Sequence, residues 1–292
     1  MKSLKFLFIL VFSLNFSQTN TIFDRLSVLE NGGKIWYNID GYSVTSEIFN
    51  YNFDEKGLKK VFRKHNISDS DQKYKDENIT LNNYFISKQQ NVIENIFQTN
   101  NYYFIESQNK TIIVIWFAKT GKTDKETEEL LVNAILENKI PKENFVPMQI
   151  SSINFADRTI ELGNSCYWTF LNTVQCPYFG EMNWSIHKTL DDAKESVKNQ
   201  FNITKSRKMG KVISEEMVDV EFEGVETKAK KAVFEINAVA STLAGGKSLT
   251  IYYVAENIRG ENVSCVMSFW NNDQINPQTK LPPLLEKLMK LK

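Results

Sequence analysis

The feature that most constrains the fold is an order of elements that occurs twice along the chain. Residues 35–53 are predicted to form one or two strands, because Phe49, Tyr51 and Phe53 fall on one face at a period of two. Residues 54–64 then follow the helical period, and Asp54 is a suitable N-cap for that helix. The first half therefore begins with strands followed by a helix.

Further strands and a second helix complete the first half. Residues 112–117 are continuously apolar, which suits a central strand that is covered on both faces. Thr123 and Glu126 form a capping-box pattern, so a helix is expected from residue 123 to about residue 138. Shorter strands are expected over residues 84–86, 92–97 and 102–105.

The second half repeats this order. A helix is expected over residues 189–201, with Thr189 as its N-cap. Residues 217–223 alternate strictly, and their acidic face meets the lysines of a return strand, as in an ordinary solvent-facing hairpin. Pro282 and Pro283 open a last helix that is expected to continue to Leu291. The other strands are expected over residues 159–170, 174–179, 249–255 and 263–269.

The predicted fold class is therefore α+β, with antiparallel sheets and packed helices in two similar domains. Residues 140–152 contain Pro141 and Pro147 and form the natural boundary. We expect an N-terminal domain over residues 18–145 and a C-terminal domain over residues 150–292. One larger α+β domain is the alternative, because the identity between the halves is too low to prove a repeat.

The first 17 residues have the pattern of a cleavable secretory signal peptide. Lys2 and Lys5 precede an apolar run that turns polar at Ser17. This run is shorter than the ~20 residues that cross a bilayer as a helix, and no later apolar run reaches that length. We expect cleavage near Ser17 and an exported chain, secreted or periplasmic, with no membrane span.

The balance of positive and negative charge argues against nucleic acid as a partner. The chain has 35 basic and 35 acidic residues and a net charge of zero. It therefore lacks the basic excess of proteins that bind nucleic acid, and no nucleic-acid partner is expected. Near-zero net charge also gives little protection from self-association.

Two of the three cysteines are candidates for a disulfide. Cys166 and Cys176 are equidistant from a predicted hairpin turn at Leu171, so they face each other across two strands. An oxidising compartment would allow them to pair. Cys265 falls on the inner face of a predicted strand and is expected to be a buried apolar residue, although it is an alternative partner for either of the other two.

The patterns of common catalytic and cofactor sites are absent. The two histidines and three cysteines do not form the short pairs that zinc sites use, so no metal and no other cofactor is expected. Residues 245–248 are similar to the end of a phosphate loop, but Ser241 stands where the first glycine is required. Cys176 and His187 lie close in the sequence without the signature of a cysteine nucleophile, and we expect structural roles for both.

Aromatic residues near loops are the remaining candidates for ligand contacts. Trp36 and Trp184 are expected to be exposed, whereas the other three tryptophans lie in strand patterns typical of core packing. The favoured function is a non-enzymatic binding or interaction protein whose partner is an unknown protein or small molecule. The alternatives are a secreted hydrolase with an unrecognised carboxylate site, and an envelope-assembly, inhibitor or immunity-type protein.

Overall fold

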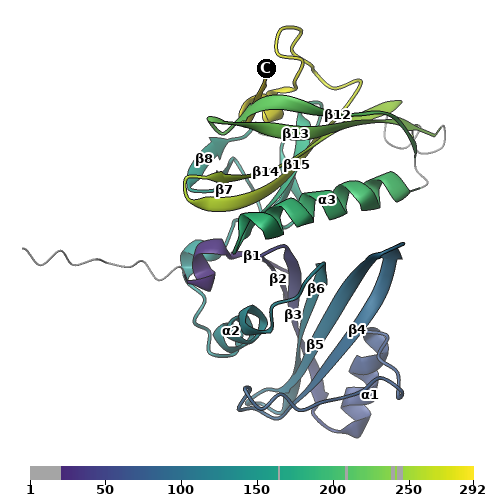
Figure 1. The fold of residues 1–292 in the computed structure, drawn as a ribbon. Coiled ribbons are helices and arrows are strands. Elements are labelled where there is room, and N and C mark those ends of the chain that lie inside the picture. The colour runs from purple at the N-terminus through teal and green to yellow at the C-terminus, as the bar shows by residue number, and fades with distance from the viewer. Residues whose placement is uncertain (1–20, 164, 208–209, 238–240, 242–245) are drawn as a thin grey trace, which may run out of the picture.

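The computed structural model describes residues 21–163, 165–207, 210–237, 241 and 246–292. The expected signal peptide lies outside the described residues, and so does Gly245. The chain folds into two units that are stacked along the long axis of the molecule (Figure 1). The first unit runs from the 3-10 helix η1 (Ile22–Arg25) to the 3-10 helix η2 (Lys142–Asn144), and the second runs from β7 to β16.

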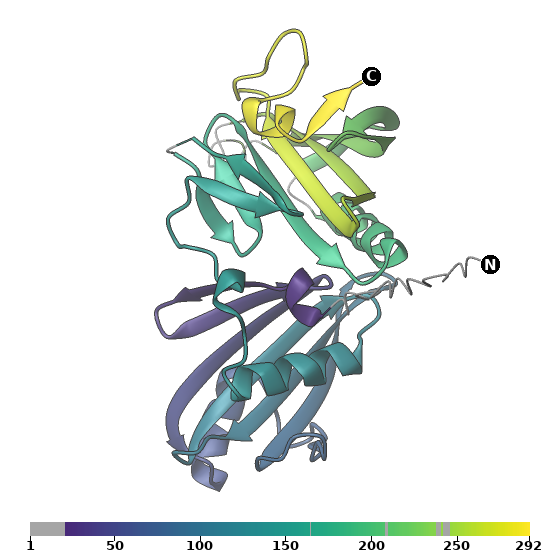
Figure 2. The ribbon, with the colours of Figure 1, turned by 90° about the vertical axis from the view of Figure 1, so that its left-hand side faces the viewer.

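The first unit is a six-stranded antiparallel sheet with one helix on each face, in the order β1-β2-β3-β6-β5-β4. Helix α2 (Lys125–Leu136) packs on one face through Leu131 and Val132, and Figure 2 shows it lying across the strands. Helix α1 (Glu55–Lys64) packs on the other face through Leu58 and Val61. The strands are β1 (Ser27–Asn31), β2 (Lys34–Ile39), β3 (Tyr42–Asn52), β4 (Asn83–Ile93), β5 (Ile96–Glu106) and β6 (Thr111–Thr120).

The second unit is an eight-stranded antiparallel sheet, in the order β16-β12-β13-β14-β15-β11-β10-β9. Helix α3 (Leu190–Ser206) packs on one face, and the β7–β8 hairpin and the short helix α5 (Pro283–Glu286) pack on the other. The strands are β7 (Ser152–Phe155), β8 (Arg158–Glu161), β9 (Tyr167–Phe170), β10 (Thr173–Cys176), β11 (Gly180–His187), β12 (Gly210–Phe222), β13 (Val225–Ile236), β14 (Ser248–Ile258), β15 (Glu261–Trp270) and β16 (Met289–Leu291).

The two sheets share one connectivity. In each, three strands form a meander, a helix follows, and the chain returns through a second meander whose last strand pairs with the third strand. The third strand is β3 in the first unit and β11 in the second, and their partners are β6 and β15. The second unit differs by one extra strand in its return meander and by the added edge strand β16. The predicted α+β class with two similar parts is therefore what the chain adopts.

Local sequence signals placed most helix starts correctly. The Asp54 carboxylate accepts a hydrogen bond from the Gly57 N–H at 2.7 Å and starts α1 as predicted. Thr189 caps α3, although that helix continues to Ser206. The expected cap of α2 is wrong by one residue. Asp124 holds the first turn instead of Thr123, because its negative carboxylate accepts from two backbone N–H groups at the positive end of the helix.

Two other expectations are corrected by the observed strand pairing. Residues 84–105 form a single long hairpin of β4 and β5 in place of three short strands. The expected C-terminal helix ends at Glu286, and residues 289–291 form β16 on the edge of β12. Leucine spacing fits a helix, but the unpaired backbone of β12 offers hydrogen bonds that a longer helix would leave unmade.

The predicted central strand is confirmed. β6 lies between β3 and β5, and its successive side chains enter the clusters on the two faces. Ile115 and Phe117 pack under α2, and Ile112 and Val114 pack under α1.

The predicted charged hairpin of the second unit is also present. Asp219 and Lys228 face each other across the β12–β13 hairpin as an ion pair at 2.7 Å. No helix within the described ranges has the length and hydropathy needed to cross a membrane.

Candidate ligand-binding groove

The predicted disulfide is present. Cys166 and Cys176 are bonded at the open end of the β9–β10 hairpin, with their Cα atoms 4.1 Å apart. The turn lies at Leu171 and Asn172, as the equal spacing of the cysteines indicated. Cys265 is free and buried, as expected. The bond joins the last two strands of the sheet and therefore fixes its edge.

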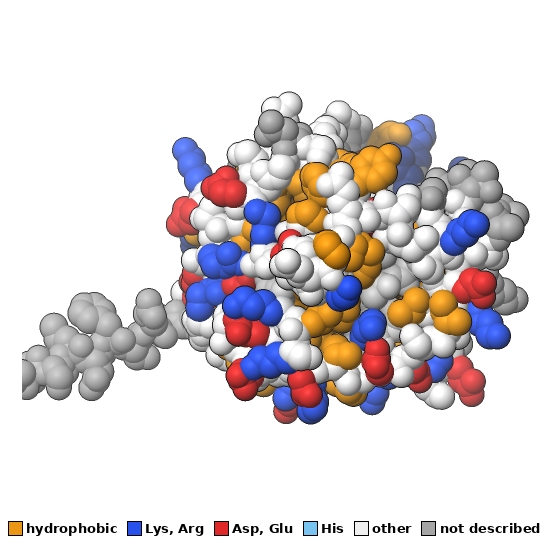
Figure 3. Space-filling model, turned by 90° about the horizontal axis from the view of Figure 1, so that it is seen from above, with side chains coloured by type: hydrophobic (Ala, Val, Ile, Leu, Met, Phe, Trp, Pro, Cys, Tyr) orange, Lys and Arg blue, Asp and Glu red, His pale blue; other side chains and the backbone are white. Residues whose placement is uncertain are grey.

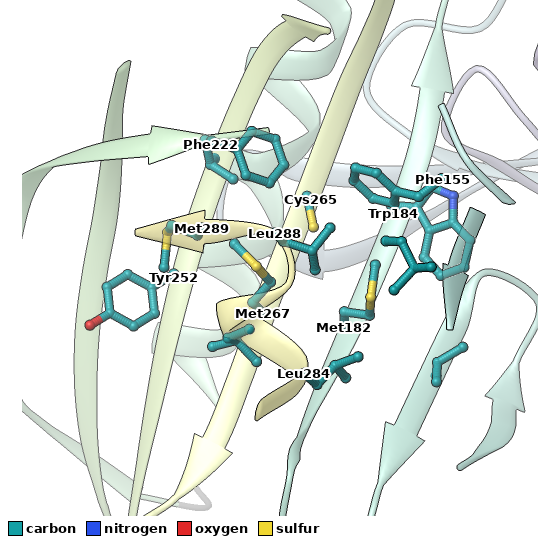
Figure 4. Close-up of a cluster of buried hydrophobic side chains, with 14 of the residues drawn as sticks. Phe155, Met182, Trp184, Phe222, Tyr252, Cys265, Met267, Leu284, Leu288 and Met289 are labelled. Carbon is teal, nitrogen blue, oxygen red and sulfur yellow. The ribbon is translucent and has the colours of Figure 1, made fainter. Parts of the chain in front are cut away.

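The expectation of two exposed tryptophans is wrong for Trp184. Its side chain is 3% exposed and packs with Phe155 in the main core of the second unit, where Figure 4 shows the two side by side. Trp184 lies on β11, a strand with a neighbour on each side, so its large ring is needed to fill the core beneath the β7–β8 hairpin. Trp36 is half-buried on β2.

The residues weighed as catalytic candidates have structural contacts. Cys176 is in the disulfide, and the His187 Nε2 lies 2.8 Å from the Ser264 Oγ, so no cysteine–histidine pair forms. Lys247 and Ser248 donate their backbone N–H groups to the Asn271 side chain, as in a turn. Among the described residues, no group of three or more histidine, cysteine or acidic side chains is placed to hold a metal ion.

One carboxylate is fully buried in the first unit. Glu128 accepts hydrogen bonds from Tyr42 and Tyr103, each at 3.0 Å, and from Asn101 at 2.8 Å. Burial raises the pKa of this carboxyl group. Its donors are all protein groups beneath α2, so they satisfy the carboxylate and leave it closed to substrate. Glu128 therefore holds the fold of the first unit together.

The two units meet through buried polar contacts. The Asp40 backbone N–H donates to the Ile186 carbonyl at 3.0 Å, and Asp40 also forms a buried ion pair with Arg25 at 2.8 Å. Asn38 accepts from Ser185 at 2.9 Å. The hollow that remains beside His187 is about 10 Å³, which is too small for a ligand.

A groove of about 780 Å³ lies on the outer face of the first unit. Its floor is apolar and aromatic. The rings of Phe53 and Tyr84 stack at 5.8 Å, and Phe62 packs edge-on against Phe104 at 4.7 Å. This size and lining are typical of small-molecule sites. The walls come from the start and outer side of α1, the following loop and β4, and their apolar members are Phe53, Leu58, Phe62, Ile67 and Tyr84.

The loop wall of the groove is held in place by its own contacts. The Asp71 carboxylate accepts from the Ser68 N–H at 2.7 Å and pairs with Lys88 at 2.9 Å. The Ser68 hydrogen bond, with that of Lys88, lowers the pKa of Asp71 to about 2. Lys73 donates to three carbonyls of the same loop, so its ammonium group is bound within the chain. Contacts within the chain thus fix the loop wall of the groove.

Helix α1 adds positive charge at the rim. Five of its ten residues are basic, although the whole chain is neutral. Lys60 and Lys64 lie over the rings of Tyr51 and Phe49 on one flank. Lys59 and Arg63, one turn apart, line the groove, and neither has an ion-pair partner within the part of the chain that the structure describes.

The groove therefore combines an aromatic floor with the cations of Lys59 and Arg63, and the carboxylates of Glu55 and Asp69 also line it. Such a site can stack an apolar or aromatic body and bind an anionic group at its end. The groove was not predicted from the sequence, although the alternation of apolar and basic residues in α1 was visible there as an amphipathic helix. Only the tertiary structure shows that β4 and the loop after α1 leave the helix partly uncovered.

Comparisons with known proteins do not identify the chain. No protein-family model matches it, and no curated protein is similar to it. Among solved structures, it is similar to the crystal structure of the di-domain ARO/CYC StfQ from the steffimycin biosynthetic pathway. The identity is 11%, over 87% of this chain and 75% of that chain, and the TM-score is 0.16. A score this low carries no argument about function.

Proposed function

We propose that this protein is an exported, non-enzymatic binding protein that holds an anionic amphipathic ligand in the groove of the first unit. The observation that carries this proposal is the pair Lys59 and Arg63, which line the groove beside its aromatic floor and have no ion-pair partner among the described residues. Unpaired cations at a preformed apolar hollow favour a ligand with a carboxylate, sulfate or phosphate group and an apolar body.

Export is part of the proposal and is supported by two features. The first 17 residues have the order of a signal peptide. The Cys166–Cys176 disulfide fits a chain that folds in an oxidising compartment. Measuring the intact mass of the protein recovered from the exported fraction tests export. We expect the mass of a chain that begins near Gln18. The mass of a chain that still contains Met1 would contradict export.

The binding test uses two fluorescent probes that share an aromatic body and differ in charge. One is anionic 8-anilinonaphthalene-1-sulfonate, and the other is neutral N-phenyl-1-naphthylamine. We expect the variant Lys59→Glu/Arg63→Glu to weaken binding of the anionic probe by about tenfold or more, because two charge-assisted contacts are lost. Binding of the neutral probe should change much less.

A matched control comes from the same helix. The variant Lys60→Glu/Lys64→Glu makes the same change of charge on the opposite flank of α1, where both lysines lie over aromatic rings and outside the groove. It should bind both probes nearly as the wild type does. Equal loss of the anionic probe in the two double variants would show general charge attraction and would reject the groove as the site.

A further inference from the structure

A second groove, of about 570 Å³, lies on the face of the first sheet that carries α2. The helix crosses this face (Figure 2), and the groove opens where the helix ends at Leu136. The groove beside α1 lies on the opposite face, and the two grooves have no lining residue in common. The volume of this second groove is in the range of small-molecule sites.

Aliphatic side chains form most of this second groove. The sheet contributes Ile35, Ile48 and Ile113, and α2 and the chain that follows it contribute Leu136, Ile140 and Phe145. Ile48 is 63% exposed and Phe145 is 38% exposed, so the chain does not cover its own apolar lining. Removing such a surface from water favours a ligand with an apolar body.

The charge in this second groove has one sign. Among the described residues that line it, none is lysine or arginine, and the acidic ones are Glu30 and Glu47. Glu47 pairs with Lys34 at 3.2 Å and lies on the α1 side of β3, as Phe49 does. Glu30 alternates with Val28, which packs under α2, so its carboxylate lies on the groove side of β1. Glu30 has no ion-pair partner within the described ranges of the chain.

Two hydroxyl groups lie near Glu30 in the same groove. The Tyr37 Oη and the Ser46 Oγ are 2.9 Å apart, and both residues line the groove. Burial, opposed by the Ser46 hydrogen bond and supported by the charge of Glu30, raises the pKa of Tyr37 to about 12. Each hydroxyl oxygen has two lone pairs, and the bond between them uses only one of these, so both oxygens can accept from a ligand.

The end of α2 adds negative potential at the groove. The last carbonyl groups of a helix carry partial negative charge, which favours a cation. The last turn of α2 has no basic residue, and Lys139, which follows it, pairs with Glu137 and does not line the groove. The Glu30 carboxylate, the hydroxyl oxygens and the helix end therefore all favour positive charge.

We propose that this groove binds a second ligand, an organic cation with an aliphatic body and an ammonium group. The ammonium group lies at Glu30 and donates to the Tyr37 and Ser46 hydroxyl oxygens, and the aliphatic body lies against Ile48 and Ile113. The first unit then has two sites of opposite charge preference on the two faces of one sheet. This site does not depend on the anionic ligand proposed for the groove beside α1.

The test compares octylammonium with 1-octanol by isothermal titration calorimetry at pH 7.5, where the amine is protonated. The two ligands share an aliphatic chain and differ in the charge of the head group. The wild type should bind octylammonium about fivefold more tightly, the size expected for a charge pair that is partly open to water. Glu30→Gln should remove this preference, and Glu30→Lys should reverse it. The affinity for 1-octanol should stay nearly constant in both variants.

Three further variants locate the site. Glu143→Lys makes the same change of charge at an exposed residue outside the groove, and it should keep the preference for octylammonium. Ile48→Trp should weaken both ligands by about threefold or more, because the larger ring fills part of the groove. The variant Lys59→Glu/Arg63→Glu changes the groove on the other face and should leave the preference as it is in the wild type.

Each other outcome overturns the proposal. Equal affinity of the wild type for the two ligands, or no binding of either, would reject a cation site. A preference that survives in Glu30→Lys would place the ammonium group on another surface, such as the outer end of the second unit, where Figure 3 shows apolar side chains between charged ones of both signs. An equal loss of preference in Glu143→Lys and Glu30→Lys would show general charge attraction instead of a contact in the groove.

Discussion

His187 is expected to make the stability of this protein fall sharply in mild acid. The ring is 1% exposed and lies at the junction between the units, against Gly41. Its Nε2 is 2.8 Å from the Ser264 Oγ, and its Nδ1 has no hydrogen-bond partner among the described residues. Burial, and then the nearby charge of Lys119, lowers the pKa of His187 from 6.5 to about 4.

The size of the effect follows from this difference in pKa. Between about pH 6.5 and pH 4, the unfolded chain binds a proton at this position and the folded chain does not, so stability is lost as the pH falls. Each pKa unit corresponds to about 1.4 kcal/mol, so the full loss in the free energy of unfolding is about 3 kcal/mol. Between pH 7.5 and pH 5, protonation of His187 in the unfolded chain lowers the free energy of unfolding by about 2 kcal/mol.

The assay is urea unfolding at pH 7.5 and at pH 5 for the wild type and for His187→Gln. Carboxyl groups and other titrating residues contribute to both proteins, so the difference between their pH dependences isolates His187. Over this pH interval, the free energy of unfolding of the variant should fall by about 2 kcal/mol less than that of the wild type. Identical pH dependences for the two proteins would refute the argument from burial.

His65 provides an independent check in the first unit. Burial also lowers its pKa to about 4, and its Nε2 has no hydrogen-bond partner in the described part of the chain. Since the two histidines lie in different units, the effects of His65→Gln and His187→Gln should add. Combining them should therefore flatten the pH dependence further than either variant alone.

Three further substitutions test the remaining structural arguments by chemical denaturation. Replacing both Cys166 and Cys176 by serine should cost about 2–3 kcal/mol, because a loop of this length is no longer closed in the unfolded chain. Glu128→Gln should cost roughly 3 kcal/mol, since an amide NH₂ then faces a buried donor, and a loss below about 1 kcal/mol would contradict the hydrogen-bond network. Gly57→Ala should destabilise α1 and the groove by roughly 2–4 kcal/mol, because its Cβ would lie 2.0 Å from the Asn52 carbonyl oxygen. Loss of probe binding should accompany that change.

The elements with local signals were predictable from the sequence. Asp54 and Thr189 start their helices because a short oxygen-bearing side chain satisfies the first free N–H groups wherever it occurs. The strict alternation in β12 and the spacing of Cys166 and Cys176 likewise depend only on the period of a strand. Those features determined the α+β class and the disulfide.

The candidate site and the sheet edges were decided by contacts between distant residues. Trp184 is buried because the β7–β8 hairpin covers it, and residues 289–291 form a strand because β12 has a free edge. The groove depends on where β4 and the loop after α1 lie relative to the helix. Sequence periodicity tells which side of an element is apolar, but only tertiary packing determines how much of that side is covered, because the covering segments are far away in the chain.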